Sequence, residues 1–178
     1  MNHPLFYINI IILLYYNNKM NKIIATAFFN HPNIKGTIEL EEINNKVLIT
    51  INLKSKKYKK SIHGFHIHEA GDLSDNCMSA CSHFNPYNKN HGGPDSKERH
   101  VGDLGNIVFN NKGECRMSME DKLVKLRGTK ANVIGRSIVI HSKEDDLGLG
   151  GDEDSLKTGN AGSRITCAVI GYSKKMCS

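Results

Sequence analysis

The chain has 178 residues, of which 39% are hydrophobic and 24% are charged. This length and composition indicate one globular domain with its own core, and they exclude a disordered or fibrous protein. The net charge of +6, from 24 Lys and Arg against 18 Asp and Glu, is moderate, so a nucleic-acid partner is not expected from charge alone.

An apolar segment, LFYINIIILLYY at residues 5–16, lies near the start of the chain. It is too short to cross a bilayer as a helix, which takes about 20 residues. It has the length of the apolar part of a signal peptide, but no positive charge precedes it and no small-x-small cleavage site follows. Because Met20 lies just before the first predicted strand, residues 1–19 are interpreted as a hydrophobic extension, signal-like or upstream of an alternative start. Residues 20–178 form the predicted domain, which is expected in the cytoplasm, or secreted if the extension acts as a signal peptide.

From there on the sequence reads as β-structure. The apolar segments are rich in Ile and Val, and clusters of Gly, Asn, Asp or Lys separate most of them. No segment shows a helical periodicity. The predicted strands cover residues 23–29, 36–43, 47–53, 64–69, 104–109, 115–120, 134–142 and 166–172. The sequence therefore predicts an all-β domain with eight strands.

The most basic run of the chain, KSKKYKK at residues 54–60, connects the third and fourth predicted strands. A run of this kind can bind nucleic acid or another polyanion. No aromatic stacking platform accompanies it, so the sequence favours a solvated, lysine-rich turn.

The fourth predicted strand carries three histidines, in HGFHIHE. Successive side chains of a strand face opposite ways, so His66 and His68 share one face. His63 lies on the other face with Phe65 and Ile67, which should be the core side. Two imidazoles then lie side by side on a face that need not be buried, and histidine is the commonest metal ligand. Two solvated histidines would be the simpler interpretation if the pair stood alone.

Two gaps between strands, residues 70–103 and 143–165, are unusually long, and long connections in a compact domain usually serve a function. They hold most of the remaining histidines, glycines and acidic residues. The further candidate ligands are His83, His91, His100, Asp103 and, at the end of a strand, His141. Three histidines with an aspartate suit a tetrahedral zinc site, and several imidazoles without a thiolate suit copper(II) or, less often, nickel(II). Spacing alone does not say which histidine joins which site.

With these residues in view, the chain from about Met20 to Tyr172 resembles the copper/zinc superoxide dismutase family. The segments GFHIHE, HFNP, HGGP, ERHVGDLGN, DDLGLGG and KTGNAGSR carry the resemblance, in the family's order. It implies an eight-stranded Greek-key β-sandwich or barrel (immunoglobulin-like) with two long functional loops. It also implies an antioxidant enzyme that converts superoxide to oxygen and hydrogen peroxide with a redox-cycling copper and a structural zinc.

The resemblance assigns each candidate ligand to a metal. The copper ligands it assigns are His66, His68, His83 and His141, and the zinc ligands are His83, His91, His100 and Asp103. His83 is then a bridging imidazolate, which is plausible near neutral pH because two cations flank it. The same histidine is expected to supply a proton to the departing peroxide.

Further residues match the family's positions around the copper. Asp145 is expected to link a copper-side to a zinc-side histidine and so to fix both rings. Arg164 is expected to dock the superoxide anion. Lys143 and Lys157 match charged residues of the substrate channel, and Thr158 matches the residue that narrows it opposite the arginine.

Five cysteines remain. In a cytosolic chain they should all be reduced, but the resemblance implies a disulfide between Cys77 and Cys167. Cys81 stands where the family usually has glycine, so it is either a rival partner or a free thiol. Cys115 and Cys177 are interpreted as structural or incidental.

The resemblance also implies a homodimer, through residues around Ala70-Gly71, Ile134-Gly135 and Val169–Tyr172. It leaves room for a copper chaperone as a partner. The rival interpretations are an inactive decoy of the same fold, which would lack a copper ligand or the active-site arginine, and a metal store. This chain keeps every ligand and Arg164, so the enzyme is favoured.

Overall fold

The computed structural model describes residues 22–177. The predicted extension, residues 1–19, lies outside them. Within the described residues, no helix has the length and apolar character needed to span a membrane.

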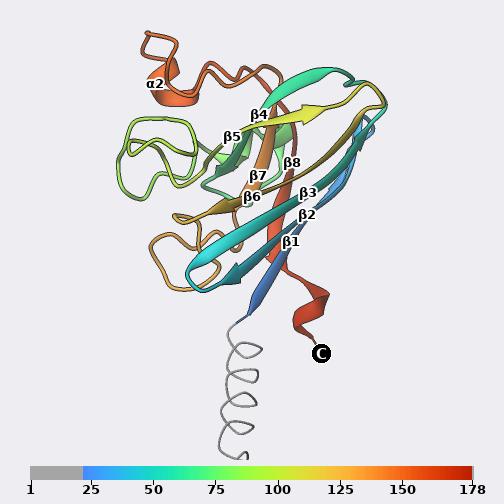
Figure 1. Ribbon diagram of the computed structural model, residues 1–178, viewed down its shortest axis with the longest axis vertical. Coiled ribbons are helices and arrows are strands. Elements are labelled where there is room, and N and C mark those ends of the chain that lie inside the picture. Colours follow the sequence, from blue (N-terminus) through green and yellow to red (C-terminus); the bar gives the residue numbers. More distant parts are fainter. Residues whose placement is uncertain (1–21, 178) are drawn as a thin grey trace, which may run out of the picture.

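Eight strands form one antiparallel sheet that curls into a near-barrel (Figure 1). The strands are β1 (Ile23–Asn30), β2 (Ile34–Ile43), β3 (Lys46–Ser55), β4 (Ser61–His68), β5 (Asp103–Phe109), β6 (Glu114–Asp121), β7 (Ser137–His141) and β8 (Arg164–Tyr172). Three short helical segments, η1 (Asp75–Ala80), α2 (Ser155–Thr158) and η2 (Lys174–Met176), lie outside the sheet. The all-β prediction is confirmed, and α2 was missed because four residues are too few to show a helical period.

The order of the strands across the sheet is β5-β4-β7-β8-β1-β2-β3-β6. Three connections, β3 to β4, β5 to β6 and β6 to β7, therefore cross between the halves of the sheet, as in a Greek key. The first and last strands are neighbours, with Ala25 opposite Tyr172. The two ends of the order, β5 and β6, are joined by a tight turn, where Asn110 N donates to Glu114 O at 2.9 Å. The two ends of the sheet are thus brought together by covalent connection.

Alternating burial in the strands explains the barrel. In β3, Val47, Ile49, Ile51 and Leu53 are buried, and the residues between them are exposed. A fully buried side chain of this kind contributes about 1.5–3 kcal/mol, so one inward face per strand is enough to build the core. The predicted strand at 134–142 is shorter in the structure, because residues 134–136 form the turn that leads into β7.

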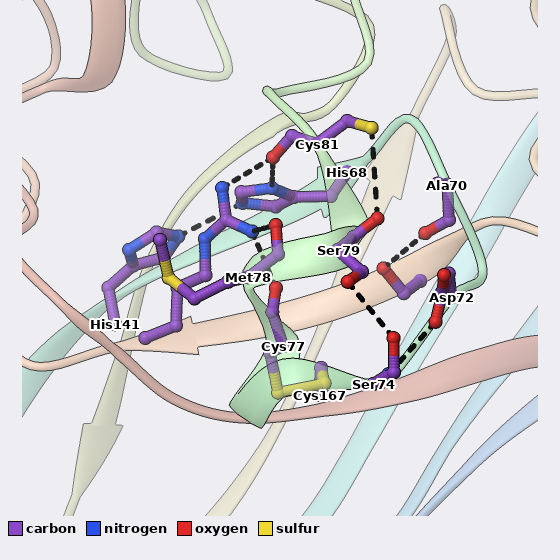
Figure 2. The surroundings of a disulfide bond; sticks show 12 residues. His68, Ala70, Asp72, Ser74, Cys77, Met78, Ser79, Cys81, His141 and Cys167 are labelled. Atoms are coloured by element: carbon purple, nitrogen blue, oxygen red, sulfur yellow. Dashed lines mark hydrogen bonds between the residues drawn. A yellow bond between two sulfur atoms is a disulfide. The ribbon is translucent and has the colours of Figure 1, made fainter.

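The predicted disulfide is confirmed. Cys77 and Cys167 are bonded, with their Cα atoms 6.0 Å apart and 90 residues between them in sequence (Figure 2). Closing a loop of this length stabilises a protein by roughly 4–5 kcal/mol in the chain-entropy description. The bond ties the first long loop to the last strand, β8. Cys81, Cys115 and Cys177 are free thiols.

Cys81 has a backbone conformation that almost only glycine adopts, with φ 64° and ψ −152°. For a residue with a Cβ this conformation costs about 1–3 kcal/mol. The physical reason why glycine suits this position is therefore visible in the structure. The carbonyl oxygen of Cys81 accepts hydrogen bonds from His68 Nδ1 and from Arg164, so these contacts hold the strained residue in place.

We expect the free energy of unfolding of the Cys81→Gly variant to exceed that of the parent by about 1 kcal/mol or more. The gain from relieved strain is partly offset by the larger entropy of glycine in the unfolded chain. Urea unfolding of the metal-free, disulfide-intact protein measures the change. The Cys81→Ala variant is the matched control, because it removes the thiol and keeps the Cβ. Equal stability of the two variants would contradict the explanation by strain.

Candidate metal centre

The predicted ligands come together at one side of the barrel, under the loops 69–102 and 142–163. In Figure 1 the green loop and α2 lie on this same side. The ligand atoms form two four-residue groups, within each of which they lie within 4.8 Å of one another. One group is His66, His68, His83 and His141, and the other is His83, His91, His100 and Asp103. His83 belongs to both groups, as the predicted bridge requires.

Strand β4 provides two ligands from one face, as its alternation predicted. His66 and His68 are nevertheless 0% and 1% exposed, because the long loops cover the face that was expected to be open. His63 points to the core side, where its Nδ1 lies 2.8 Å from His141 O and its Nε2 3.0 Å from Ser61 Oγ. Both of its nitrogens are thereby engaged, and His63 is not a ligand in either group.

In the all-histidine group, backbone carbonyls orient two of the rings. His68 Nδ1 donates to Cys81 O at 2.9 Å, and His141 Nδ1 donates to Gly162 O at 3.2 Å. Their Nε2 atoms then face each other at 3.2 Å. Two ring nitrogens whose lone pairs converge in this way form a suitable pair of donors for one cation. The rings of His66 and His83 complete the group, with centroids 4.1 Å apart.

In the second group, Asp103 is the centre. Its Oδ1 lies 2.9 Å from His83 Nδ1 and 3.0 Å from the Nδ1 atoms of His91 and His100. Its other oxygen accepts hydrogen bonds from His100 N at 2.7 Å and Gly92 N at 3.2 Å, which fix the carboxylate. Three imidazoles around one carboxylate are the donor set of a tetrahedral zinc site. Because His83 uses Nδ1 here, its Nε2 is left for the other group.

Asp145 connects the two groups. Its Oδ2 lies 2.7 Å from His66 Nε2, and its Oδ1 lies 2.8 Å from His91 Nε2. The Nδ1 atoms of these two histidines are buried and have no hydrogen-bond partner; that of His91 approaches Asp103 without the direction of a hydrogen bond. A buried nitrogen without a partner is costly unless a cation binds it. The two nitrogens point into the two groups, so the residues fit copper and zinc.

Burial sets the protonation of the copper-side histidines. It lowers the pKa of His68 to about 2 and that of His141 to about 4, helped by the nearby His83. It also lowers the pKa of His66 well below the ordinary value. On the zinc side, burial is outweighed by the carboxylates of Asp103 and Asp145, which raise the pKa of His91 to about 9. One group is therefore neutral at pH 7, and the other holds a proton.

We expect zinc affinity to fall steeply with acidification and copper affinity to fall little between pH 8 and pH 5. Below about pH 9 the metal-free His91 is protonated, so a bound zinc displaces one proton and its affinity drops about tenfold per pH unit. His68 and His141 stay neutral over this range and release no proton. Competition with a chelating dye at each pH measures the affinity for each metal alone, because His83 would lose its own ring proton only when both metals are bound. Equal slopes for the two metals would contradict this assignment of the proton.

A pocket of about 730 Å³ opens onto the all-histidine group. Among the residues that line it are His68, His83, His141, Lys143, Lys157, Thr158 and Arg164. The two lysines differ in surroundings, because Lys157 pairs with Glu153 at 2.8 Å while Lys143 forms no ion pair with a described residue. All the predicted channel residues therefore lie around one opening.

Three backbone carbonyls hold the Arg164 side chain. They belong to residues 77–81, the disulfide segment, which begins at the bonded Cys77. Its Nη1 donates to Cys77 O at 2.5 Å and to Met78 O at 3.0 Å, and its Nη2 donates to Cys81 O. Figure 2 shows His68, Met78 and Cys81 together above the disulfide. A guanidinium has five N–H donors, so some remain for an anion in the pocket. The disulfide thus supports the placement of the arginine.

Sequence reasoning missed Asn106, which holds the backbone of Asp145. Asn106 Nδ2 donates to Asp145 O, and Asp145 N donates to Asn106 Oδ1, both at 2.8 Å. The pair anchors the second long loop to β5 and fixes the carboxylate between the two groups. The available signal was a single amide inside the otherwise apolar strand LGNIVF.

It also missed Arg99, a buried residue behind the zinc group. Arg99 donates to Asp103 O at 2.7 Å and forms an ion pair with Asp121. The other carboxylate oxygen of Asp121 accepts from Leu123 N and Val124 N at 2.7 Å. This network joins the first metal loop to the end of β6. A charged residue in a loop is usually solvated, so the sequence offered no signal for its burial.

Comparisons with known proteins agree with this geometry. The sequence model described as copper/zinc superoxide dismutase matches residues 34–170. A superoxide dismutase [Cu-Zn] of Paramecium bursaria Chlorella virus 1 is 54% identical over 158 residues, which are 89% of this chain and 83% of that protein. Superoxide dismutase [Cu-Zn] 5 of Dictyostelium discoideum is 46% identical, over 84% of this chain and 98% of that protein.

Two further relatives extend the comparison. An extracellular superoxide dismutase [Cu-Zn] of Brugia pahangi is 46% identical, over 84% of this chain and 75% of that protein. A crystal structure of the clock protein EA4 superposes with a TM-score of 0.81 at 42% identity, covering 84% of this chain and 94% of that one. The family match spans most of the chain and includes both ligand groups. The chain therefore belongs to the copper/zinc superoxide dismutase family.

Proposed function

We propose that this protein dismutes superoxide, so that two superoxide anions and two protons yield one oxygen and one hydrogen peroxide. The observation that carries the proposal is the pair of ligand groups sharing His83, open to a pocket that contains Arg164 and Lys143. Bound copper would supply the one-electron oxidation and reduction, while zinc has no accessible redox change and serves structure. The side chains of this protein would bind the anion, deliver the proton and orient the ligand rings.

Arg164 is proposed to bind the anion. The carbonyls of the disulfide segment fix its guanidinium beside His68, His83 and His141. A fixed donor needs no reorganisation when charge arrives, which is the main source of electrostatic catalysis. Lys143 and Lys157 are proposed to attract superoxide towards the opening, and Thr158 to narrow it.

His83 is proposed to handle the proton. Its Nδ1 lies 2.9 Å from Asp103 Oδ1, which leaves Nε2 for the all-histidine group, and the residue lines the pocket. A proton held at Nε2 can be delivered to the reduced anion at that opening. Asp145 supports the cycle from behind, since its bonds to His66 and His91 keep both rings oriented.

Metal analysis together with a superoxide-consumption assay tests the proposal. The purified protein should bind about one copper and one zinc per chain, and removing copper should abolish the activity while much of the fold remains. Circular dichroism of the same sample supplies the control for folding. Full activity without copper would overturn the proposal.

The inactive decoy is the second candidate. A decoy would lack a copper ligand or the arginine of the pocket, and this chain has all of them in position. Copper binding without superoxide consumption would favour the decoy or the metal store. Full copper loading from a copper salt alone would show that no chaperone is required.

A homodimer is proposed through the surface that carries Val169 and Tyr172, which are 38% and 62% exposed. Gly71 in the same region is needed within the chain, because a Cβ there would lie 2.1 Å from Gly135 O. Sedimentation analysis of the parent and of Tyr172→Glu tests the dimer.

We propose the cytoplasm as the compartment, with secretion as the alternative. Fractionation of cells that make the protein distinguishes the two.

A further inference from the structure

Lysines gather at the pole of the barrel where β4 begins, away from the metal centre. This lysine pole consists of Lys35, Lys54, Lys56, Lys57, Lys59, Lys60 and Lys112, all of which are exposed. In Figure 1 the connection from β3 to β4 and the turn from β5 to β6 meet at the upper right. The basic run seen in the sequence is thus joined by lysines from two other parts of the chain.

These lysines have few partners. Lys54 pairs with Glu114 at 3.0 Å, and none of the others forms an ion pair with a residue between 22 and 177. Lys35 lies directly opposite Lys54 in the pairing of β2 with β3. Like charges in that arrangement destabilise a sheet. Glu114 is thus the one ion-paired counter-charge of this cluster among the described residues, and a cluster with such an excess of positive charge is a candidate binding surface for an anion.

The pole also has a defined shape. A hollow of about 380 Å³, a size typical of small-molecule sites, lies within it. Its lining residues are Pro32, Asn33, Lys35, Lys54, Ser55, Lys56, Lys112 and Glu114. Four lysines from three chain segments therefore line one concavity, together with Glu114, which pairs with Lys54.

The three segments are held in place by contacts within the chain: β2 pairs with β3 at Lys35 and Lys54, and hydrogen bonds join the end of β3 to the β5–β6 turn. Ser55 N donates to Gly113 O at 2.7 Å, and Lys60 N donates to Asn110 O at 3.1 Å. Ser55 Oγ accepts from Tyr58 N at 2.7 Å. Gly113 has φ +73°, and a Cβ there would lie 2.2 Å from Ser55 O, so the close approach depends on glycine. A preformed site of this kind loses little entropy on binding.

We propose that the lysine pole binds a compact anion carrying several phosphate groups, such as an inositol polyphosphate or the headgroup of a phosphoinositide. Each phosphate monoester has a charge of about −1.5 to −2 at pH 7 and three acceptor oxygens. A few such groups on one small scaffold match four converging lysines better than evenly spaced charges on a long polymer. Tyr58 is half-buried with its ring against His63, so no exposed ring in the pole serves to stack a base.

The pole is separate from the proposed catalytic site. Along β4, the nearest ligand on that strand, His66, lies about 16 Å from Ser61 at 3.3 Å per residue. This exceeds the Debye length of about 10 Å at 0.1 M salt. Substitutions in the pole are therefore expected to leave superoxide consumption unchanged, which keeps a failure of this proposal distinct from a failure of the proposed function.

Calorimetric titration with inositol hexakisphosphate at physiological salt tests the site. We expect one ligand per chain, and about fivefold weaker binding for each of Lys35→Gln and Lys112→Gln. Lys122→Gln is the matched control, because it removes the same charge beyond Asp121, at the other end of β6. Lys143→Gln is the control for binding in the catalytic pocket. Neither control should change the affinity.

A second arm identifies the source of the phosphates. Cosedimentation with vesicles that contain phosphatidylinositol bisphosphate, but not with phosphatidylcholine alone, would assign the site to a lipid headgroup; binding of only the free compound would assign it to a soluble ligand. The proposal is overturned by several ligands per chain, by equal losses in Lys122→Gln and Lys35→Gln, or by no binding. Tighter binding of duplex DNA that grows with its length would also overturn it.

Discussion

Replacing Arg164 by glutamate is expected to lower the second-order rate of superoxide loss by at least about 100-fold, the effect of removing one fixed donor from a charged reaction site. The variant also places a negative charge beside His68, His83 and His141, where a small anion must arrive. Superoxide is too small to offer much surface for binding. A high rate must therefore come from electrostatic attraction of the anion and from positive charge fixed beside the all-histidine group. Stopped-flow measurement of superoxide decay gives the rate. A near-normal rate in the variant would show that Arg164 does not dock the anion.

The channel lysines serve as the comparison for Arg164. A cleft lined with positive charge raises capture by about 10- to 1000-fold, and salt screens the effect. Lys143 is unpaired among the described residues and Lys157 is paired with Glu153, so Lys143→Gln should lose more rate and more salt dependence than Lys157→Gln. Both should lose far less than Arg164→Glu. A parent rate that does not change between low and high ionic strength would contradict steering.

Replacing His83 by alanine is expected to weaken copper and zinc binding together. It is the one residue that belongs to both ligand groups of the described chain. Loss of a residue that merely supports a ligand costs 10- to 100-fold in metal affinity, so loss of the ligand itself should cost about 100-fold or more for each metal. Equilibrium competition with chelators of known affinity measures both constants on the same preparation.

Two matched variants make the result specific. His141→Ala removes a ligand of the all-histidine group only, and His100→Ala removes one of the group around Asp103 only. We expect the first to affect copper and the second to affect zinc, whereas His83→Ala affects both. If the His83 variant changed the affinity for only one metal, the assignment of His83 as a ligand shared by both metals would be wrong. If all three variants lost both metals, the two groups would act as one site.

The strands and the faces of the ligands could be predicted from sequence because both depend on short-range alternation. His66 and His68 share a face in any extended backbone, and Ile49 and Ile51 in β3 mark the core side in the same way. The shift in pairing between Gly64 and His66 did not alter this parity. Composition and turn residues were likewise enough to separate the strands.

The deep burial of the ligands could not be predicted, because it depends on where two long loops fold back. Nothing local in the sequence shows that Asp145 meets both His66 and His91, or that Asn106 holds its backbone. The family resemblance supplied the first of these contacts and was silent on the second. The positive φ of Cys81 is a further case, since residue type alone indicates the opposite conformation.

The adjacency of β1 and β8 has a consequence for the newly made protein. A ribosome produces β1, β2 and β3 early and β8 late, so the neighbour of Ala25 on that side, Tyr172, does not yet exist when β1 emerges. Until then β1 presents unpaired N–H and C=O groups, which can pair with the same edge of another growing chain. Slow translation of the second half of the message lengthens this interval, and neighbouring nascent chains on one message are then the most exposed to mispairing.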